Sequence, residues 1–520
     1  MNRTAEEMTL EQKIGMVLCL RRFQEDDLEF IGELVNMRAV GCVQGPRKRD
    51  PKLQKVLEKA DGPILYVADM EQGAPGTELP EIPLLALAAC DREAYYRSFA
   101  KGIVRDAKAG GFNANWGPVL DLVTPDAPEF VHRKLSDDPE EVGRRAAFIA
   151  DVFRQNHFLS CGKHYPGSSG LNIDTHMAEA ASELPEAFIK ERNLAPYRYL
   201  MERDLLPSIM VGHTIYKNID PDRPATLSKK VIGIIREWGY DGLVFSDSFA
   251  MMSVLQRFGE DRIYGMAMDA GIDVILPNYR TSARDSYELL MKNFREGLFT
   301  EARLNEAVRR ILAAQRFVSL PPEDPTEFTA EDRANLDLVA RDCITAVTDD
   351  GVPAALDRED RERLFVVLTP NGYEPDAEIP EIGTSKWYDP GRVEKRIRKN
   401  FPNARVERMP EFSGWEDHER ILNLATKYRE VVVVTFCYSS AYLGTDGLTR
   451  RCEAWINGMQ SSGKISAVVH FGNPSALQTI AHVPRRIFGY TVPASQDHAI
   501  DVLAGVCEAK GKLPYHLVLQ

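Results

Sequence analysis

The sequence predicts an α/β protein: a TIM-type (β/α)8 barrel followed by an open parallel-sheet α/β sandwich domain. Three observations predict it. Apolar runs alternate with amphipathic helical patterns from residue 12 to about residue 315, polar residues gather at the ends of those runs, and a second series of runs follows a Pro- and acid-rich stretch. A repeated strand–helix order implies parallel strands, because a parallel pair needs a long crossover connection.

Eight short apolar runs are the expected strands of the first domain. They lie at residues 16–20, 39–45, 64–71, 113–122, 159–166, 207–213, 242–248 and 273–278, and amphipathic helices between them include 138–157, 228–239 and 283–297. Eight strand–helix units in about 300 residues fit a closed barrel better than an open sheet, which remains the alternative.

Several of these runs stay apolar until their last positions, which carry polar side chains. These residues are Asp69, Glu71, Asp121, Lys163, His164, His213, Asp247 and Asn278. Barrel enzymes build their sites at the C-terminal ends of the strands, where the loops converge on one mouth. The pattern therefore predicts an active site at that rim.

The predicted domain boundaries follow from composition. Residues 1–320 form the expected catalytic barrel, residues 321–335 a linker rich in Pro, acidic residues and Ser/Thr, and residues 336–520 the α/β sandwich domain. In the last segment, runs at 363–370, 430–439, 465–474 and 485–491 alternate with helical patterns. This order predicts a second, open parallel sheet.

Composition restricts the partners. The formal net charge of −13 argues against nucleic acid and against an anionic membrane surface. The N-terminus lacks the apolar core of a secretory signal, no apolar run approaches the length of a membrane span, and the eight cysteines contain no C-x-x-C pair. We expect a cytoplasmic protein with reduced thiols and no cofactor; a homodimer is left open.

Asp174 and His176 lie two positions apart in a loop that begins GKHYPG at residue 162. Spacing of i, i+2 on an extended segment puts both side chains on one side of the chain. A carboxylate beside an imidazole can orient the ring and stabilise its protonated form. Two alternatives are a turn-capping Asp beside an incidental His, and a metal site that also uses His164; the helical H-x-x-x-H spacing of zinc sites is absent.

Among the other candidates, Asp247 and Arg133 each have a structural alternative, whereas Lys163 and His164 do not. Asp247 ends an apolar run, so it could attack a sugar carbon, hold a metal or cap the next helix. Arg133, in a polar loop, could bind a hydroxyl or carboxylate, or pair with Asp137. Lys163 and His164 at a strand end need partners, and sugar hydroxyls or site carboxylates would supply them.

The motifs resemble those of glycoside hydrolase family 3, specifically its bacterial β-N-acetylglucosaminidase branch. GKHYPG and the following D-T-H are similar to that family's K-H-F-P-G…D-S-H signature. Further matches, in the same order as in the family, are LEQKIGMVL, YVADMEQG, ANWGPVLDL, HRKLSDDP, SIMVGHTIYKNIDPDRPATLS, GLVFSDSFAMMSV and AGIDVILP. A weaker similarity in FGNPSAL and GKLPYHL extends to the second domain.

The resemblance implies a role for each matching residue. Asp247 takes the place of the nucleophile and His176 that of the general acid/base, assisted by Asp174 on a mobile loop. The places that hold the terminal sugar's hydroxyls in the family correspond to Asp69, Arg133, Lys163 and His164. The chain departs from the family pattern at Gly167-Ser168-Ser169 and after Gly73.

The predicted function is retaining exo-cleavage of a terminal β-linked N-acetylglucosamine from a soluble glycan or cell-wall fragment, without a metal. In such a reaction a carboxylate forms a glycosyl-enzyme that water then hydrolyses. The alternatives are another β-glycosidase of the family, a β-glycoside phosphorylase, because an imidazole would not repel an anionic acceptor, and a catalytically silent sugar-binding protein.

Overall fold

The computed structural model describes residues 3–46, 50–74, 79–124, 130–171, 173–323, 327–369, 388–437, 441–442 and 447–519. The chain divides into two compact units. The first comprises Met1–Leu79, Tyr96–Ala127 and Leu135–Asp332, and the second comprises Pro80–Tyr95, Pro128–Lys134 and Arg333–Gln520. Two short segments of the N-terminal half thus belong to the second unit, so the units do not follow one cut in the chain.

A closed ring of parallel strands forms the centre of the first unit, as predicted. The strands are β1 (Cys19–Arg21), β2 (Cys42–Gln44), β3 (Leu65–Ala68), β4 (Ala114–Asn115), β5 (Gly162–Tyr165), β7 (Ser208–Val211), β9 (Leu243–Ser248) and β10 (Val274–Leu276). Ladders run β1-β2-β3-β4 and β5-β7-β9-β10. Parallel bridges join the two ladders at both sides, Leu18 to Ile275 and Ala114 to Leu159. The strands therefore follow one another around the ring in chain order.

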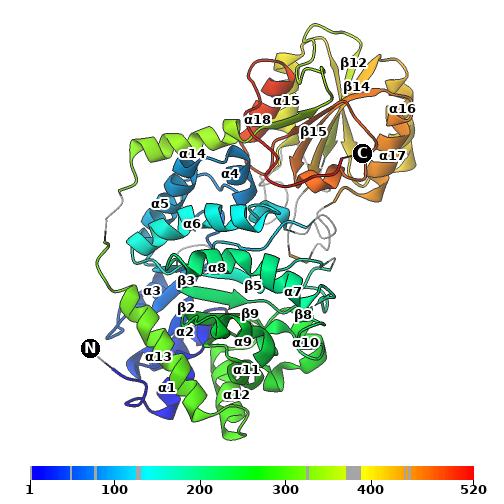
Figure 1. Ribbon diagram of the computed structural model, residues 1–520. Helices are drawn as coiled ribbons and strands as arrows, with labels where there is room; N and C mark the ends of the chain where they lie inside the picture. Colours follow the sequence, from blue (N-terminus) through cyan, green and yellow to red (C-terminus); the bar gives the residue numbers. More distant parts are fainter. Residues whose placement is uncertain are drawn as a thin grey trace. The chain divides into compact units, whose positions relative to one another are not determined.

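Helices surround this ring (Figure 1). They include α1 (Leu10–Met16), α2 (Glu25–Asn36), α3 (Pro51–Leu57), α5 (Glu93–Ala109), α6 (Pro139–Gln155), α8 (Ala195–Met201), α9 (Lys229–Glu237), α10 (Met252–Phe258), α11 (Glu260–Ala270), α12 (Ala283–Arg295) and α13 (Glu301–Phe317). The start of α6 shows why the sequence makes a helix there. Asp138 caps it by accepting from Glu140 N, Pro139 stands at the first helical position, and Val142, Ala146 and Ile149 are buried at helical spacing.

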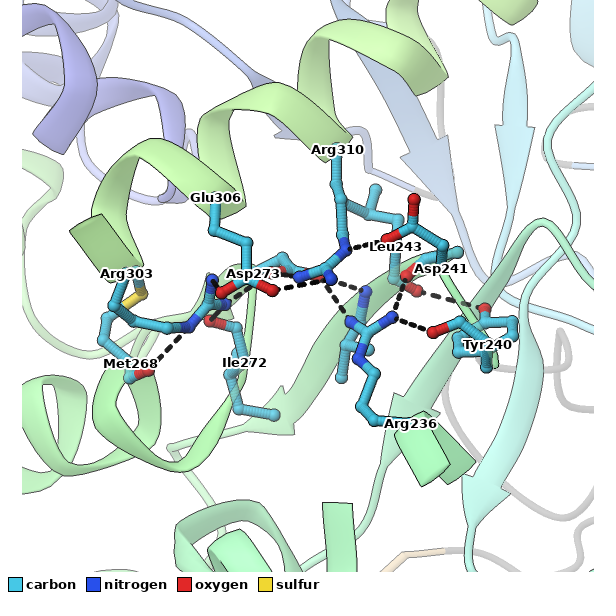
Figure 2. A network of polar contacts seen from close by, with 12 residues as sticks. Arg236, Tyr240, Asp241, Leu243, Met268, Ile272, Asp273, Arg303, Glu306 and Arg310 are labelled. Atoms are coloured by element: carbon cyan, nitrogen blue, oxygen red, sulfur yellow. Dashed lines mark hydrogen bonds and ion pairs between the residues drawn. The ribbon is translucent and has the colours of Figure 1, made fainter. Parts of the chain in front are cut away.

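The N-terminal ends of β9 and β10 are held by a network of charged residues (Figure 2). Asp273 precedes β10 and is fully buried. Its carboxylate oxygens lie 2.5 Å from the guanidinium of Arg303, 3.1 Å from that of Arg236 and 3.3 Å from that of Arg310. It also accepts the Val244 amide of β9 at 3.0 Å. This carboxylate ties α9, α13 and two strands together at the end of the barrel opposite to the strand C-termini.

The second unit is built on a six-stranded sheet with the order β11-β16-β15-β14-β12-β13. The strands are β11 (Thr345–Thr348), β12 (Arg363–Thr369), β13 (Arg405–Pro410), β14 (Glu430–Cys437), β15 (Ile465–Gly472) and β16 (Arg485–Phe488). All the pairs are parallel except β11 with β16. The predicted open parallel sheet is therefore present, with one antiparallel edge strand that the sequence analysis did not predict.

Helices pack on both faces of this sheet (Figure 1). α15 (Pro390–Asn400) and α18 (Ser495–Leu503) cover one face, and α16 (Trp415–Ala425) and α17 (Arg450–Gln460) the other. The N-terminal segment of this unit contributes α4 (Leu84–Cys90), and Tyr95 OH donates to Asp342 of α14 (Ala330–Asp342) at 2.8 Å. In the described part of the chain, no helix combines the length and apolar character needed to cross a bilayer.

Candidate active site

A buried lysine joins two carboxylates at the C-terminal end of β3. Lys163 Nζ lies 2.7 Å from Asp69 Oδ1 and 2.5 Å from Glu71 Oε1. The lysine side chain is 2% exposed, whereas that of Asp69 is 45% exposed. The two ion pairs offset the cost of burying the ammonium group. They leave the carboxylate of Asp69 at a solvent-accessible edge, where hydroxyl groups could bind it.

The next residue, His164, contacts two further carboxylates. Its Nδ1 lies 2.7 Å from Asp121 Oδ2, and its Nε2 lies 4.0 Å from Asp247 Oδ2. Consecutive residues of a regular strand point to opposite faces. Here the register of β5 against β7 shifts between Lys163 and Tyr165, and both side chains meet carboxylates from other strand ends. The structure thus brings together Asp69, Asp121, Lys163, His164 and Asp247.

Asp247 stands at the C-terminal end of β9 with an open carboxylate. Its Oδ1 accepts the amide of Ser248 at 2.7 Å. It does not cap the following helix, because α10 begins at Met252 without a side-chain cap. Burial acts to raise the pKa of Asp247, but the imidazoles of His164 and His213 and the Ser248 amide outweigh it, so this pKa is lowered. The group is therefore an ionised carboxylate at neutral pH.

His213, at the end of β7, supports the segment that carries Asp247. Its Nε2 lies 3.0 Å from the Ser248 carbonyl and its Nδ1 lies 2.8 Å from Thr226 Oγ1. A carbonyl only accepts, so Nε2 carries the hydrogen. Burial lowers the pKa of His213, and His176 and His164 lower it further against the opposing effects of Asp247 and the Ser248 carbonyl. We infer a positioning role for this buried ring.

The loop that follows β5 pairs a carboxylate with an imidazole. Asp174 Oδ1 accepts from His176 Nδ1 at 2.8 Å and from the His176 amide at 2.9 Å. The Asp174 side chain is 2% exposed and that of His176 is 25% exposed. Because Nδ1 is bonded to Asp174, proton exchange with a substrate has to use Nε2.

The same loop is attached to the segment that begins α10. The amides of Met252 and Ser253 donate to the carbonyls of His176 and Thr175, each at 3.3 Å. These are N–H groups of the first helical turn, which have no partner within a helix. The loop therefore satisfies the start of α10, and the resulting position lets His176 contribute to the lowered pKa of Asp247.

The beginning of this loop is anchored on the barrel side. Tyr216 OH donates to the Gly167 carbonyl, and Gly167 has a φ of +114°. A Cβ at Gly167 would lie 3.0 Å from Asn193 Cβ, so both the backbone conformation and the close packing favour glycine. Ser169, which replaces a family residue, is buried, and its carbonyl accepts from Ser182 Oγ.

Two residues that the sequence placed near the site, Arg133 and Asn278, have additional or different contacts in the structure. Arg133 ends the 3-10 helix η1 (Val131–Arg133) of the second unit, with its guanidinium 5.6 Å from the Phe130 ring. Its role in binding sugar remains a prediction. Asn278 donates to Glu260 of α11 at 3.1 Å, and it also lines a cavity together with Ser248.

Glu71 and Asp121 received no role from the sequence beyond their strand-end position. Their contacts with Lys163 and His164 depend on spatial neighbours that the sequence does not specify. The alternative of a metal site gains no support: among the described residues, no three or more His, Cys, Asp or Glu side chains are grouped so that they could hold a metal ion.

Comparison with known proteins places this geometry in a family. Residues 4–314 match the model of the glycosyl hydrolase family 3 N-terminal domain. The chain belongs to glycosyl hydrolase family 3. It is thus a glycoside hydrolase, and the matched region spans the barrel and every strand end described above.

Relatives and solved structures agree on the wider fold. The chain is 24% identical over 465 residues to a β-N-acetylglucosaminidase/β-glucosidase of Cellulomonas fimi, covering 83% of this chain and 82% of that protein. It is 32% identical over 227 residues to a β-hexosaminidase of Alkalilimnicola ehrlichii, covering 41% and 64%. A family 3 β-N-acetylglucosaminidase from Paenibacillus sp. superposes with a TM-score of 0.79 at 22% identity, covering 99% and 100%.

A second solved structure, a β-glucoside phosphorylase, superposes with a TM-score of 0.81 at 21% identity, covering 98% of this chain and 95% of that one. At these identities the two superpositions show the fold, in which a TIM-type barrel is followed by an α/β sandwich. They do not distinguish between acceptors of the sugar.

Proposed function

We propose that this protein is a retaining exo-β-N-acetylglucosaminidase. It would release a terminal β-linked N-acetylglucosamine from a glycan or cell-wall fragment, without a cofactor. The names of the relatives from Cellulomonas fimi and Alkalilimnicola ehrlichii support the sugar. The single observation that carries the mechanism is the arrangement of an ionised Asp247 with the Asp174–His176 pair on a loop bonded to the start of α10.

In the first step, the carboxylate of Asp247 attacks the anomeric carbon. The bond from that carbon to the leaving oxygen breaks, and the Nε2 proton of His176 passes to this oxygen. In the second step, neutral His176 takes a proton from water as the water attacks the same carbon and frees Asp247. Asp174 orients the ring and stabilises the imidazolium.

The terminal sugar would be held by Asp69, Lys163, His164 and Arg133. Asp69 offers an exposed carboxylate, and the ion pair with Lys163 fixes its position. His164 stands between Asp121 and Asp247, which places a ring nitrogen at the edge of the reacting centre. The proposed location is cytoplasmic, the proposed domain boundaries are 1–320, 321–335 and 336–520, and a homodimer remains open.

The test is a panel of nitrophenyl β-glycosides assayed with and without phosphate. Release of nitrophenol from the β-N-acetylglucosaminide in preference to the β-glucoside supports the proposal. A glycosyl phosphate product that appears only with phosphate identifies a phosphorylase instead. No release from any member of the panel identifies a sugar-binding protein, which calorimetry with N-acetylglucosamine then detects.

A second experiment tests the nucleophile directly. A 5-fluoro glycosyl fluoride of N-acetylglucosamine should add one glycosyl mass to the peptide that contains Asp247. A label on a peptide with Asp69 or Asp121 would reassign the nucleophile.

A further inference from the structure

Two polar side chains at the ends of neighbouring strands form no hydrogen bond with the residues that the structure describes. Arg21 ends β1 and Gln44 ends β2, and the two are direct partners in the parallel ladder. Both are half-buried. Within the described part of the chain, no carboxylate pairs with Arg21 and no group bonds the side chain of Gln44. Side chains of partnered residues in adjacent strands point the same way, so the guanidinium and the carboxamide stand side by side.

These two side chains point toward the interior of the barrel mouth. Cys19 and Cys42, two residues earlier on the same strands, have their Sγ atoms 3.3 Å apart. Burial raises the pKa of the Cys42 thiol well above its usual range, and the thiols of Cys19 and of Cys161 beside β5 raise it further. Cys161 comes from the far side of the ring, so these thiols face the barrel axis. Side chains of a strand alternate between its two faces, so Arg21 and Gln44, two residues further along, also face the axis and lie one layer nearer to the mouth.

A cavity connects this pair with the proposed nucleophile. Arg21, Gln44 and Ser248 line the same cavity, together with Tyr279. Ser248 directly follows Asp247 on β9. An occupant of the cavity would therefore lie beside the reacting centre, in the direction of β1 and β2.

The other basic groups described at the mouth already have partners. Arg280, whose guanidinium lies 4.6 Å from the Tyr279 ring centroid, donates to the Ala250 carbonyl at 3.1 Å, and three others pair with carboxylates. Lys163 pairs with Asp69 and Glu71, His164 with Asp121, and His176 with Asp174. A partly desolvated guanidinium without a counter-ion is costly unless a ligand or water satisfies it. In a mouth rich in carboxylates, Arg21 is thus the described cation that remains available to an anionic group.

An aromatic ring fixes the orientation of the guanidinium. The Arg21 Cζ atom lies 5.3 Å from the centroid of the Tyr279 ring, and the Phe23 ring, 58% exposed, lies 5.8 Å from that of Tyr279. Contact with a ring face leaves the N–H groups of the planar fork available for a planar anion. The exposed ring beside it offers an apolar surface to a sugar or aryl group.

We propose that Arg21 and Gln44 form a binding site for an oxyanion, carried either as a carboxylate on the leaving group or as a phosphate acceptor. Arg21 supplies two charge-assisted hydrogen bonds and Gln44 a third from its amide. This inference rests on the proposed function for the position of the substrate, but the anion site itself can be measured without turnover.

The kinetic test compares two matched aryl β-N-acetylglucosaminides, one with a carboxylate and one with a carboxamide on the ring. The wild-type protein should prefer the carboxylate in kcat/KM. Arg21→Met should reduce this preference by about 10- to 150-fold, the value of hydrogen bonds to a charged group. Gln44→Leu should reduce it by about 2- to 10-fold, as for a neutral donor.

The matched control is Arg309→Met on α13. It removes the same charge from an exposed side chain whose only ion pair joins Glu6, so the preference should not change. An equal loss of kcat/KM on both substrates in Arg21→Met would mean that Arg21 supports the fold or the sugar, and would overturn the inference.

Calorimetric titration with glucuronate and with inorganic phosphate distinguishes a carboxylate on the leaving group from a phosphate acceptor. It also tests the anion site separately from the proposed glycosidase function. Glucuronate binding that is lost in Arg21→Met identifies a leaving-group site, and phosphate binding lost in the same variant identifies an acceptor site. Turnover of neutral glycosides with no binding of either anion would leave the proposed function intact and remove the anion site. Arg21-dependent binding of an anion without any turnover would support the anion site and contradict the proposed function.

Discussion

Asp247 and Asp273 stand near opposite ends of two neighbouring barrel strands, and they differ in how their charge is satisfied. Asp273, at the N-terminal end of β10, is fully buried and receives three arginines and an amide (Figure 2). Asp247, at the C-terminal end of β9, is 18% exposed; among the described residues its carboxylate accepts a hydrogen bond from the Ser248 amide alone, with His164 Nε2 4.0 Å away. The carboxylate of an aspartate is thus fully engaged in ion pairs at the N-terminal end of the strands, whereas at the C-terminal end it accepts few hydrogen bonds.

This difference separates structural from reactive carboxylates. A buried carboxylate with every lone pair bonded cannot approach a substrate without breaking several charge-assisted hydrogen bonds. A carboxylate held ionised by imidazoles at a distance keeps an oxygen that can form a new bond. The N-terminal end of a barrel is associated with stability and the C-terminal end with chemistry, and these two aspartates give that division a local physical basis.

The largest expected effect is on turnover. Asp247→Asn removes the proposed nucleophile and should lower kcat by about 10⁴-fold or more, the scale of losses when a nucleophile is deleted. The free energy of unfolding should change by about 1 kcal/mol or less, because the carboxylate makes a single hydrogen bond. Steady-state assays and urea denaturation measure both. Normal turnover in this variant would show that the Asp247 carboxylate is not the nucleophile.

The second prediction tests the carboxylate at the N-terminal end of the strands. Asp273→Asn leaves Arg236, Arg303 and Arg310 without their shared anion, and should cost about 3–5 kcal/mol of unfolding free energy. The kcat of the folded fraction should stay at the wild-type value.

Asp241→Asn is the matched control for this network. Asp241 bonds Arg310 at 2.9 Å, but its side chain is 86% exposed, so its replacement should cost less than about 1 kcal/mol. Equal losses of stability in the two variants would show that burial does not distinguish the two carboxylates.

The sequence predicted the barrel and the strand-end polar residues because both depend on local periodicity. It did not predict the partners. Glu71 and Asp121 lie at the expected strand ends, but only packing decides that one contacts Lys163 and the other His164. Asn278 satisfies the same pattern and lines the cavity beside Ser248, but its side chain bonds Glu260 of a helix. A pattern of polar strand ends identifies the rim but not which of its members face the axis.

The Asp273 network was missed for a related reason. Asp273 and its three arginines come from α9, α13 and the start of β10, and each looks like ordinary surface charge in the sequence. The antiparallel strand β11 was also missed, since its run Thr345–Thr348 is only four residues long. In both cases the deciding contacts join segments far apart in the chain.

The third prediction concerns the loop acid. His176→Ala should lower kcat/KM by about 10²–10⁴-fold more for a natural disaccharide than for a dinitrophenyl glycoside, whose leaving group needs no proton. Asp174→Ala should show the same bias more weakly, because it orients and tunes the ring. Both variants should accumulate the Asp247 glycosyl-enzyme from the activated substrate, detectable by mass spectrometry. Equal losses on the two substrates would assign the loop to sugar binding.

The smallest expected effect is a shift in pH dependence. Asp247 has a lowered pKa because nearby imidazoles, His164 first among them, outweigh its burial. His164→Gln removes that imidazole, so the pKa of Asp247 rises and the carboxylate protonates at a higher pH. The acidic limb of the pH profile of kcat/KM should therefore move to higher pH, while the basic limb should move much less. His482→Gln, an exposed histidine of the second unit that pairs with Asp349, is the control and should leave both limbs in place. An unchanged acidic limb in His164→Gln would mean that the ionisation of Asp247 depends on the Ser248 amide and the remaining imidazoles. Asp247 would then resemble Asp273, whose charge is held by fixed hydrogen bonds.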